Sequence, residues 1–126
     1  MIERKRMQDK SLSLEMARTA YAALSAKKGQ EIVVIDISEI SSIADYFVIA
    51  HGNNVRQVQA MADEVELKMK DAGFIPGHIE GYQNANWILM DYKDIAIHVF
   101  SADDRAFYDL ERIWQEGKKL TEEELA

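Results

Sequence analysis

The stretch Glu80–Phe100 constrains the fold of this chain more than any other. It holds two apolar runs, Trp87–Met90 and Ile95–Phe100, which the polar residues 91–94 separate. Short runs rich in β-forming residues, separated by so few positions, are typical of two strands joined in an antiparallel hairpin. The chain therefore predicts a hairpin in its second half, and the other elements have to cover or extend it.

The two faces of this hairpin differ in composition. With Tyr92 and Lys93 as the loop, the opposed pairs would be Asp91 with Asp94, Leu89 with Ala96, and Trp87 with His98. Side chains alternate between faces, so one face is wholly aliphatic and is predicted to lie in the core: Ile88, Met90, Ile95, Ile97 and Val99. The other, called the mixed face below, carries Trp87, Leu89, Asp91, Asp94, Ala96 and His98. Such a face is either covered by a helix or used to bind a partner.

Length and charge narrow the class of protein. At 126 residues the chain is about one domain long, and we expect a single domain over 1–126 with flexible ends at 1–10 and 120–126. The absence of cysteine excludes disulfides, thiolate metal sites and cysteine nucleophiles. The net charge of −7 argues against a large contact with nucleic-acid phosphates, so little or no direct nucleic-acid binding is expected. An acidic body suits a basic partner surface, or simply favours solubility.

No apolar run reaches the length of a membrane span, and residues 1–10 do not resemble a signal peptide. We therefore expect a cytoplasmic protein that does not bind membranes.

Apolar periodicity and capping residues predict the remaining elements. A first helix would begin at Ser11 or Ser13 and end at 27–29, and two strands would follow over 32–37 and 45–50. A helix over 55–72, capped by Asn53 or Asn54, precedes a short strand over 78–82 and then the hairpin. A last helix from Ser101 to Gly117 would bury Phe107, Leu110 and Trp114. The fold class is α/β, a single domain with a mixed sheet of about five strands flanked by helices.

Catalytic patterns are not found. The chain has no glycine-rich phosphate-binding loop and no Asp-x-Asp pair to hold magnesium. Its histidines, His51, His78 and His98, lack the spacing of metal ligands. Asp91 and Asp94 lie close across the predicted turn, where aspartates usually shape the turn rather than act on a glycoside. We expect no catalytic residue, no metal and no cofactor.

Six short motifs in order, covering Leu14 to about Lys119, carry a family resemblance. They are Asp45-Tyr46-Phe47-Val48-Ile49-Ala50, Gly52-Asn53 with Arg56-Gln57-Val58, Glu80-Gly81, Trp87-Ile88-Leu89-Met90-Asp91-Tyr92, His98-Val99-Phe100, and Arg105-Ala106-Phe107-Tyr108-Asp109-Leu110-Glu111 with Trp114. Together they resemble the ribosomal silencing factor (RsfS, or Iojap) family. Two positions depart from the family pattern, since Asn54 stands where serine is usual and Lys93 where glycine usually follows Asp-Tyr in the turn.

The resemblance implies a nucleotidyltransferase-like fold without its active site, and no enzymatic activity. It implies that the protein binds the large ribosomal subunit through ribosomal protein L14, blocks association with the small subunit and so represses translation under nutrient limitation. The alternative from another class is a divergent nucleotidyltransferase-fold enzyme. A free homodimer that hides the patch around Trp87 and Leu89 is a further possibility.

The predicted partner-binding residues lie on the mixed face and the strand before it. Trp87 is expected to be the anchor, because a desolvated tryptophan is a frequent hot spot, with Tyr82 and Leu89 beside it. Glu80, Asp91 and Asp94 would form an acidic rim that steers a basic partner. His98 completes the set as a strand residue facing the partner.

Overall fold

The computed structural model describes residues 2–126, with side chains from Lys10 onward. The elements are α1 Ile2–Ala26, β1 Gln30–Asp36, β2 Tyr46–Gly52, α2 Val55–Asp71, β3 His78–Glu80, β4 Trp87–Asp91, β5 Ile95–Ser101, α3 Ala102–Tyr108, α4 Leu110–Ile113, β6 Lys118–Lys119 and α5 Glu122–Leu125. The predicted α/β class, a single domain with a mixed sheet flanked by helices, is confirmed.

The sheet has six strands in the order β3-β4-β5-β2-β1-β6. The pair β2 and β5 is parallel and the other neighbours are antiparallel. The parallel partner of β2 is β5, because β3 pairs with β4 at the edge of the sheet. The strand not expected from the sequence is β6, which is two residues long and too short to give an alternating pattern.

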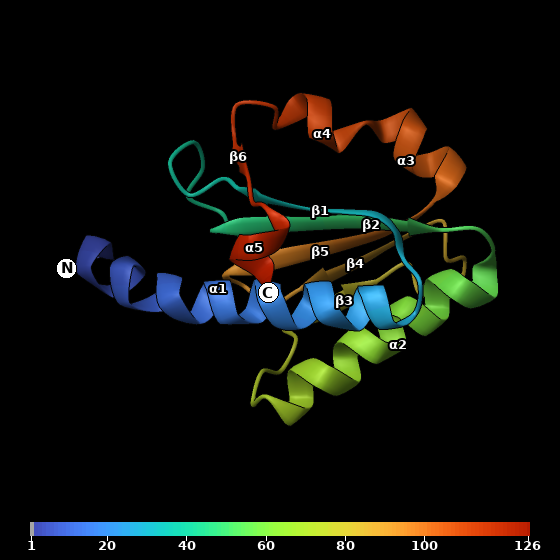
Figure 1. The fold of residues 1–126 in the computed structure, drawn as a ribbon, viewed down its shortest axis with the longest axis horizontal. Coiled ribbons are helices and arrows are strands. Elements are labelled where there is room, and N and C mark those ends of the chain that lie inside the picture. The colour runs from blue at the N-terminus through green and yellow to red at the C-terminus, as the bar shows by residue number, and fades with distance from the viewer. Residues whose placement is uncertain (1) are drawn as a thin grey trace.

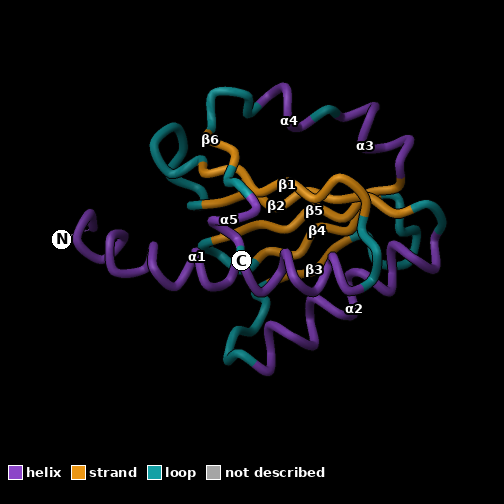
Figure 2. The backbone as a smooth tube through the Cα atoms, viewed as in Figure 1, coloured by secondary structure: helices purple, strands orange, loops and turns teal. Residues whose placement is uncertain are grey.

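Helices cover the sheet from both sides, as Figures 1 and 2 show. The helices α1 and α2 pack on one side, and α3 and α4 lie over the other. The aliphatic face of the hairpin is buried under α1 and α2, as predicted, with Ile88, Met90, Ile95, Ile97 and Val99 fully inaccessible to solvent. The helix α2 begins at its predicted cap, since the Asn54 side chain accepts a hydrogen bond from the Gln57 amide.

The hairpin turns one residue later than predicted. Asp91 lies opposite Ala96, Leu89 opposite His98 and Trp87 opposite Phe100, so the predicted register is wrong by two residues. The cause is Tyr92, which is buried against the α1–α2 layer and so stays in line with Met90. Lys93 then becomes the first loop residue with φ of 77°, and the Asp94 amide donates to the Tyr92 carbonyl across a γ-turn. Both faces keep their predicted members because the change preserves the alternation, and Phe100 joins the mixed face.

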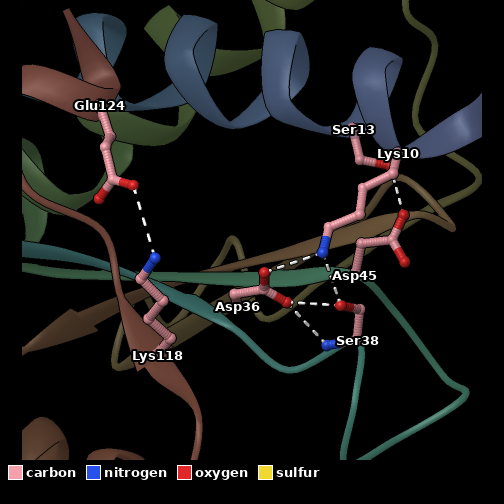
Figure 3. Close-up of polar contacts among 7 residues, drawn as sticks. All are labelled: Lys10, Ser13, Asp36, Ser38, Asp45, Lys118 and Glu124. Carbon is pink, nitrogen blue, oxygen red and sulfur yellow. Dashed lines mark hydrogen bonds and ion pairs between the residues drawn. The ribbon is translucent and has the colours of Figure 1, made fainter. Parts of the chain in front are cut away.

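The first helix starts earlier than predicted. Ser13 does not cap it, because α1 already begins at Ile2, and the Ser13 hydroxyl instead donates to Asp45 over 2.7 Å. Lys10 donates to both Asp36 and Ser38, as Figure 3 shows. We expected a flexible segment over residues 1–10. The structure does not describe the side chains of residues 1–9, so this expectation stays a prediction.

The C-terminal residues pack on the domain rather than extending from it. The Leu120 amide donates to the Val34 carbonyl, and Thr121 caps α5 with Glu124 in a reciprocal capping box. Leu125 is buried in the α1–α2 layer. This acidic segment thus contributes one apolar side chain to the core, and the flexible end expected at 120–126 stays a prediction.

The predicted last helix is broken. Ser101 caps α3 as expected, but Asp109 adopts a left-handed conformation with φ of 50°, and α4 starts in a new direction. Leu110 and Trp114 pack on Phe47 and its neighbours as predicted. Phe107 does not, since it is 79% exposed, and its assignment to the core was wrong. The break rotates the end of α3 so that Phe107 faces solvent.

Candidate partner-binding surface on the mixed face

Trp87 lies at the start of β4 and is half-buried. Its indole Nε1 donates to His98 Nδ1 over 3.1 Å, and its ring lies 5.0 Å from that of Phe100 and 4.6 Å from that of Tyr108. The helix layer formed by α3 and α4 therefore covers this side of the sheet only in part. On this side of the sheet Phe47 and Phe100 are covered, whereas Trp87 and Leu89 retain exposed surface.

His98 is the most buried titratable group of this face, with 5% of its surface exposed. Burial lowers the pKa of its imidazole to about 4, so the ring is neutral at neutral pH. An indole nitrogen can only donate, so Nδ1 must accept, and the ring proton is on Nε2. Phe47 packs edge-on against the ring at 4.7 Å. One nitrogen of the imidazole thus accepts a hydrogen bond from Trp87, and the other carries a buried N–H.

A cavity of about 210 Å³ opens on the same side of the sheet. Leu89, Ala96 and His98 form part of its lining, and Ile43 and Phe47 contribute from the β1–β2 connection and β2. Asp91 and Lys93 are its charged members. Ile43 is 65% exposed, so the apolar surface continues out of the cavity. The predicted residues Leu89, Asp91 and His98 are brought together here.

A buried arginine holds α3 and α4 in place. The Arg105 guanidinium forms a two-point pair with Glu111, at 3.1 and 2.9 Å, and donates to the Gln30 carbonyl at 3.1 Å. It also donates to His51 Nδ1 at 3.0 Å. Burial, together with the Arg105 charge, lowers the pKa of His51. Since these contacts join α3, α4, β1 and β2, Arg105 fixes the break at Asp109.

The sequence did not predict the exposed apolar group that this arrangement creates. Phe107, Tyr108 and Ile113 are 79%, 42% and 63% exposed, and we call them the α3–α4 ridge. Tyr108 links the ridge to Trp87 through their ring contact. The one signal for it was Asp109, because aspartate tolerates the left-handed conformation better than most residues and can therefore break a helix.

The predicted acidic residues lie at the rim with different partners. Glu80 is opposite Leu89 on β3, which places it on the mixed side, and its carboxylate pairs with His78. Asp91 accepts a hydrogen bond from the Lys93 amide in the turn. Asp94 is half-buried next to them, and its carbonyl accepts from the Asp45 amide.

Tyr82 is placed elsewhere. Its hydroxyl donates to Asp63 of α2 over 3.1 Å, and its carbonyl accepts from Gln59 of the same helix. These contacts tie it to the helix layer on the aliphatic side, whereas Trp87 faces the mixed side.

Among the described residues, no three histidine or carboxylate side chains gather as a metal site would need. Over that same part of the chain, no helix has the length and apolar character to cross a membrane.

Comparison with known proteins gives consistent matches. The sequence model of the family described as "Ribosomal silencing factor during starvation" matches residues 10–126. A ribosomal silencing factor RsfS from Halalkalibacterium halodurans is 41% identical over 100 residues, which cover 79% of this chain and 86% of that protein. A mouse protein named mitochondrial assembly of ribosomal large subunit protein 1 is 28% identical, over 72% of this chain and 41% of its own length.

A solved structure is also similar. The crystal structure of a Chromobacterium violaceum protein superposes with a TM-score of 0.79 at 34% identity, and the match covers 85% of this chain and 88% of that one. This chain belongs to the ribosomal silencing factor (RsfS) family.

Proposed function

We propose that this protein is a ribosome-binding repressor rather than an enzyme. It binds the large ribosomal subunit in the cytoplasm through ribosomal protein L14, and it blocks association with the small subunit when nutrients are limiting. Membership of the ribosomal silencing factor family supports the general role. The contact with ribosomal protein L14, the block of subunit association and the response to nutrients are what the family resemblance implies.

One observation supports the mixed face as the docking surface. Apolar side chains that are partly or largely exposed extend across it, from Ile43 through Leu89 and Trp87 to the α3–α4 ridge. Exposed apolar groups are usually scattered singly on soluble proteins, and a continuous group indicates an interaction site. Trp87 is the expected anchor, because it is held by His98 and Tyr108 and still has surface to bury.

Charge supports a basic partner. Glu80, Asp91 and Asp94 border the apolar surface, and the chain carries −7 overall. Rim charges of this kind speed encounter with an oppositely charged surface more than they add affinity. A basic region of ribosomal protein L14 would fit this border.

The same surface also suits self-association of the free protein. We propose that it self-associates as a homodimer until the ribosome is available, because burying Trp87, Leu89 and Phe107 would remove apolar surface from water. Light scattering over a range of concentrations tests this, and a strictly monomeric protein would contradict it.

Co-sedimentation with purified large subunits tests the main proposal. Phe107→Ala removes an exposed ring at little cost to folding, so it should weaken binding while the melting temperature stays unchanged. Ile75→Ala is the matched control, because Ile75 is 69% exposed in the connection between α2 and β3. Trp87→Ala should weaken binding further, by about 2 kcal/mol, with some loss of stability.

Two results of the co-sedimentation experiment would contradict the proposal. If the unaltered protein fails to sediment with large subunits at low salt, it is not a ribosome-binding factor. If it binds and Phe107→Ala and Trp87→Ala bind equally well, the docking surface lies elsewhere. The enzyme alternative would gain support if calorimetry showed heat on mixing with nucleoside triphosphates and magnesium.

A further inference from the structure

His98 carries a buried donor that nothing in the described part of the chain accepts. Its Nδ1 is occupied by the Trp87 indole, so Nε2 bears the proton, yet Nε2 has no hydrogen-bond partner there. A buried donor that is left unsatisfied costs much of its desolvation energy, and such groups are uncommon enough to need an explanation. A hydrogen-bond acceptor supplied from outside the chain would satisfy it.

The cavity on the mixed face provides the place for that acceptor. Trp87, Leu89 and Asp91 follow one another on this face of β4, and His98 pairs with Leu89 in the middle. Nδ1 of the ring faces Trp87, and His98 is also one of the residues that line the cavity. The cavity is lined there by Leu89, Asp91 and Ala96 together with His98.

Size and lining limit what can enter. At about 210 Å³ the cavity is below the roughly 300–1,000 Å³ of small-molecule sites, and it suits a single amino-acid side chain. Ile43, Phe47, Leu89 and Ala96 make most of the lining apolar. These four apolar side chains offer a water molecule no hydrogen bond, whereas stable buried water usually makes about three.

We propose that this cavity takes one apolar side chain of the protein partner, and that His98 Nε2–H donates to a neutral carbonyl oxygen of the same partner segment. The inference rests on the proposed function and specifies the chemistry of its docking surface. A neutral carbonyl is favoured because the charged lining residues, Asp91 and Lys93, have opposite signs and leave no net charge to attract an ion. The imidazole is neutral, so it offers no charge to compensate.

Two substitutions test the two halves of the proposal. His98→Asn keeps an oxygen near the Nδ1 position for the Trp87 indole and removes the Nε2 donor. Ala96→Leu fills the cavity from its own wall and leaves His98 intact. The control is Ala22→Leu, which adds the same atoms at an exposed position of α1, on the other side of the sheet.

Affinity for purified large subunits is the measurement, with thermal melting to confirm folding. We expect each of His98→Asn and Ala96→Leu to weaken binding about tenfold, and Ala22→Leu to bind as the unaltered protein does. If both variants fold and bind within about twofold of the unaltered protein, the inference is overturned and the proposed function stands. If the unaltered protein does not bind at all, both fall.

A spectroscopic measurement covers the case in which His98→Asn fails to fold. The Nε2 proton of His98 in the unaltered protein should shift downfield in ¹⁵N-edited spectra when purified ribosomal protein L14 is added. An unchanged resonance in a saturated complex would overturn the hydrogen bond, and Ala96→Leu would still decide whether the cavity is used.

Discussion

The buried imidazole of His98 should make folding stability depend on pH in a defined way. Its pKa is about 4 in the folded protein, because burial disfavours the charged ring, and 6.5 in an ordinary exposed histidine. Between these values the unfolded chain binds a proton that the folded chain does not. Stability therefore falls as the pH falls through this window, and the loss is complete once the pH is below the folded-state pKa.

The magnitude follows from the two pKa values. Each unit of difference is worth about 1.4 kcal/mol, and most of the interval is crossed between about pH 7 and pH 4.5. His98 alone should then cost about 2 kcal/mol of unfolding free energy over that range. This conversion is appropriate because the side chain is only 5% exposed, so solvent screens it little.

Urea unfolding across this pH range measures the effect, and His98→Asn isolates it. Carboxylates also titrate near the acidic end, but they do so in both proteins, so the difference between the two free energies reports on His98. We expect that difference to change by about 2 kcal/mol in favour of the variant as the pH is lowered. A difference that stays constant within about 0.5 kcal/mol would refute the argument, as would a histidine resonance titrating near pH 6.5 in the folded protein.

Three further outcomes are expected. Lys93→Gly should raise stability by about 1 kcal/mol in thermal melts, because Lys93 has φ of 77°, and Lys93→Ala should give no such gain; equal melting temperatures for all three would contradict this. Arg105→Ala should cost about 3 kcal/mol, because it leaves the partly buried Glu111 carboxylate unpaired, and amide exchange should speed up first in α3 and α4 rather than uniformly. Glu80→Gln with Asp91→Asn should slow association with large subunits at low salt and leave dissociation nearly unchanged; a faster dissociation instead would mean that these acids make direct contacts.

The hairpin shows why some features could be predicted from sequence and others could not. The assignment of residues to its two faces depends only on alternation, and a change of turn by one residue in each strand leaves that intact. The turn itself depended on whether Tyr92 was a loop or a core residue, and its burial against α1 and α2 is a tertiary contact that no local pattern reveals. Lys93 stands where the family usually has glycine, so the residue type that indicates a turn at this position is missing from the sequence.

The candidate surface was predictable in part for the same reason. Trp87, Leu89 and His98 could be placed together because they share one face of two adjacent strands. Phe107 was misassigned because its spacing to Leu110 and Trp114 fits one continuous helix, and that continuity ends at Asp109. Tyr82 follows β3 in the chain, but its contacts with Asp63 and Gln59 come from α2, far away in sequence.

The short C-terminal strand bears on how copies of this protein can meet. An open strand edge is a template for pairing with another chain. At the β1 edge, β6 covers Ile35 and Asp36, and the start of β1 is irregular between Gln30 and Val33. The opposite edge is β3, which is only three residues long and carries His78 and Glu80. Neither border of the sheet described here offers a long run of unpaired amides and carbonyls. A dimer of this protein should therefore form through side-chain surfaces rather than by joining two sheets into one, and it should dissociate without disturbing the hydrogen bonds of either copy.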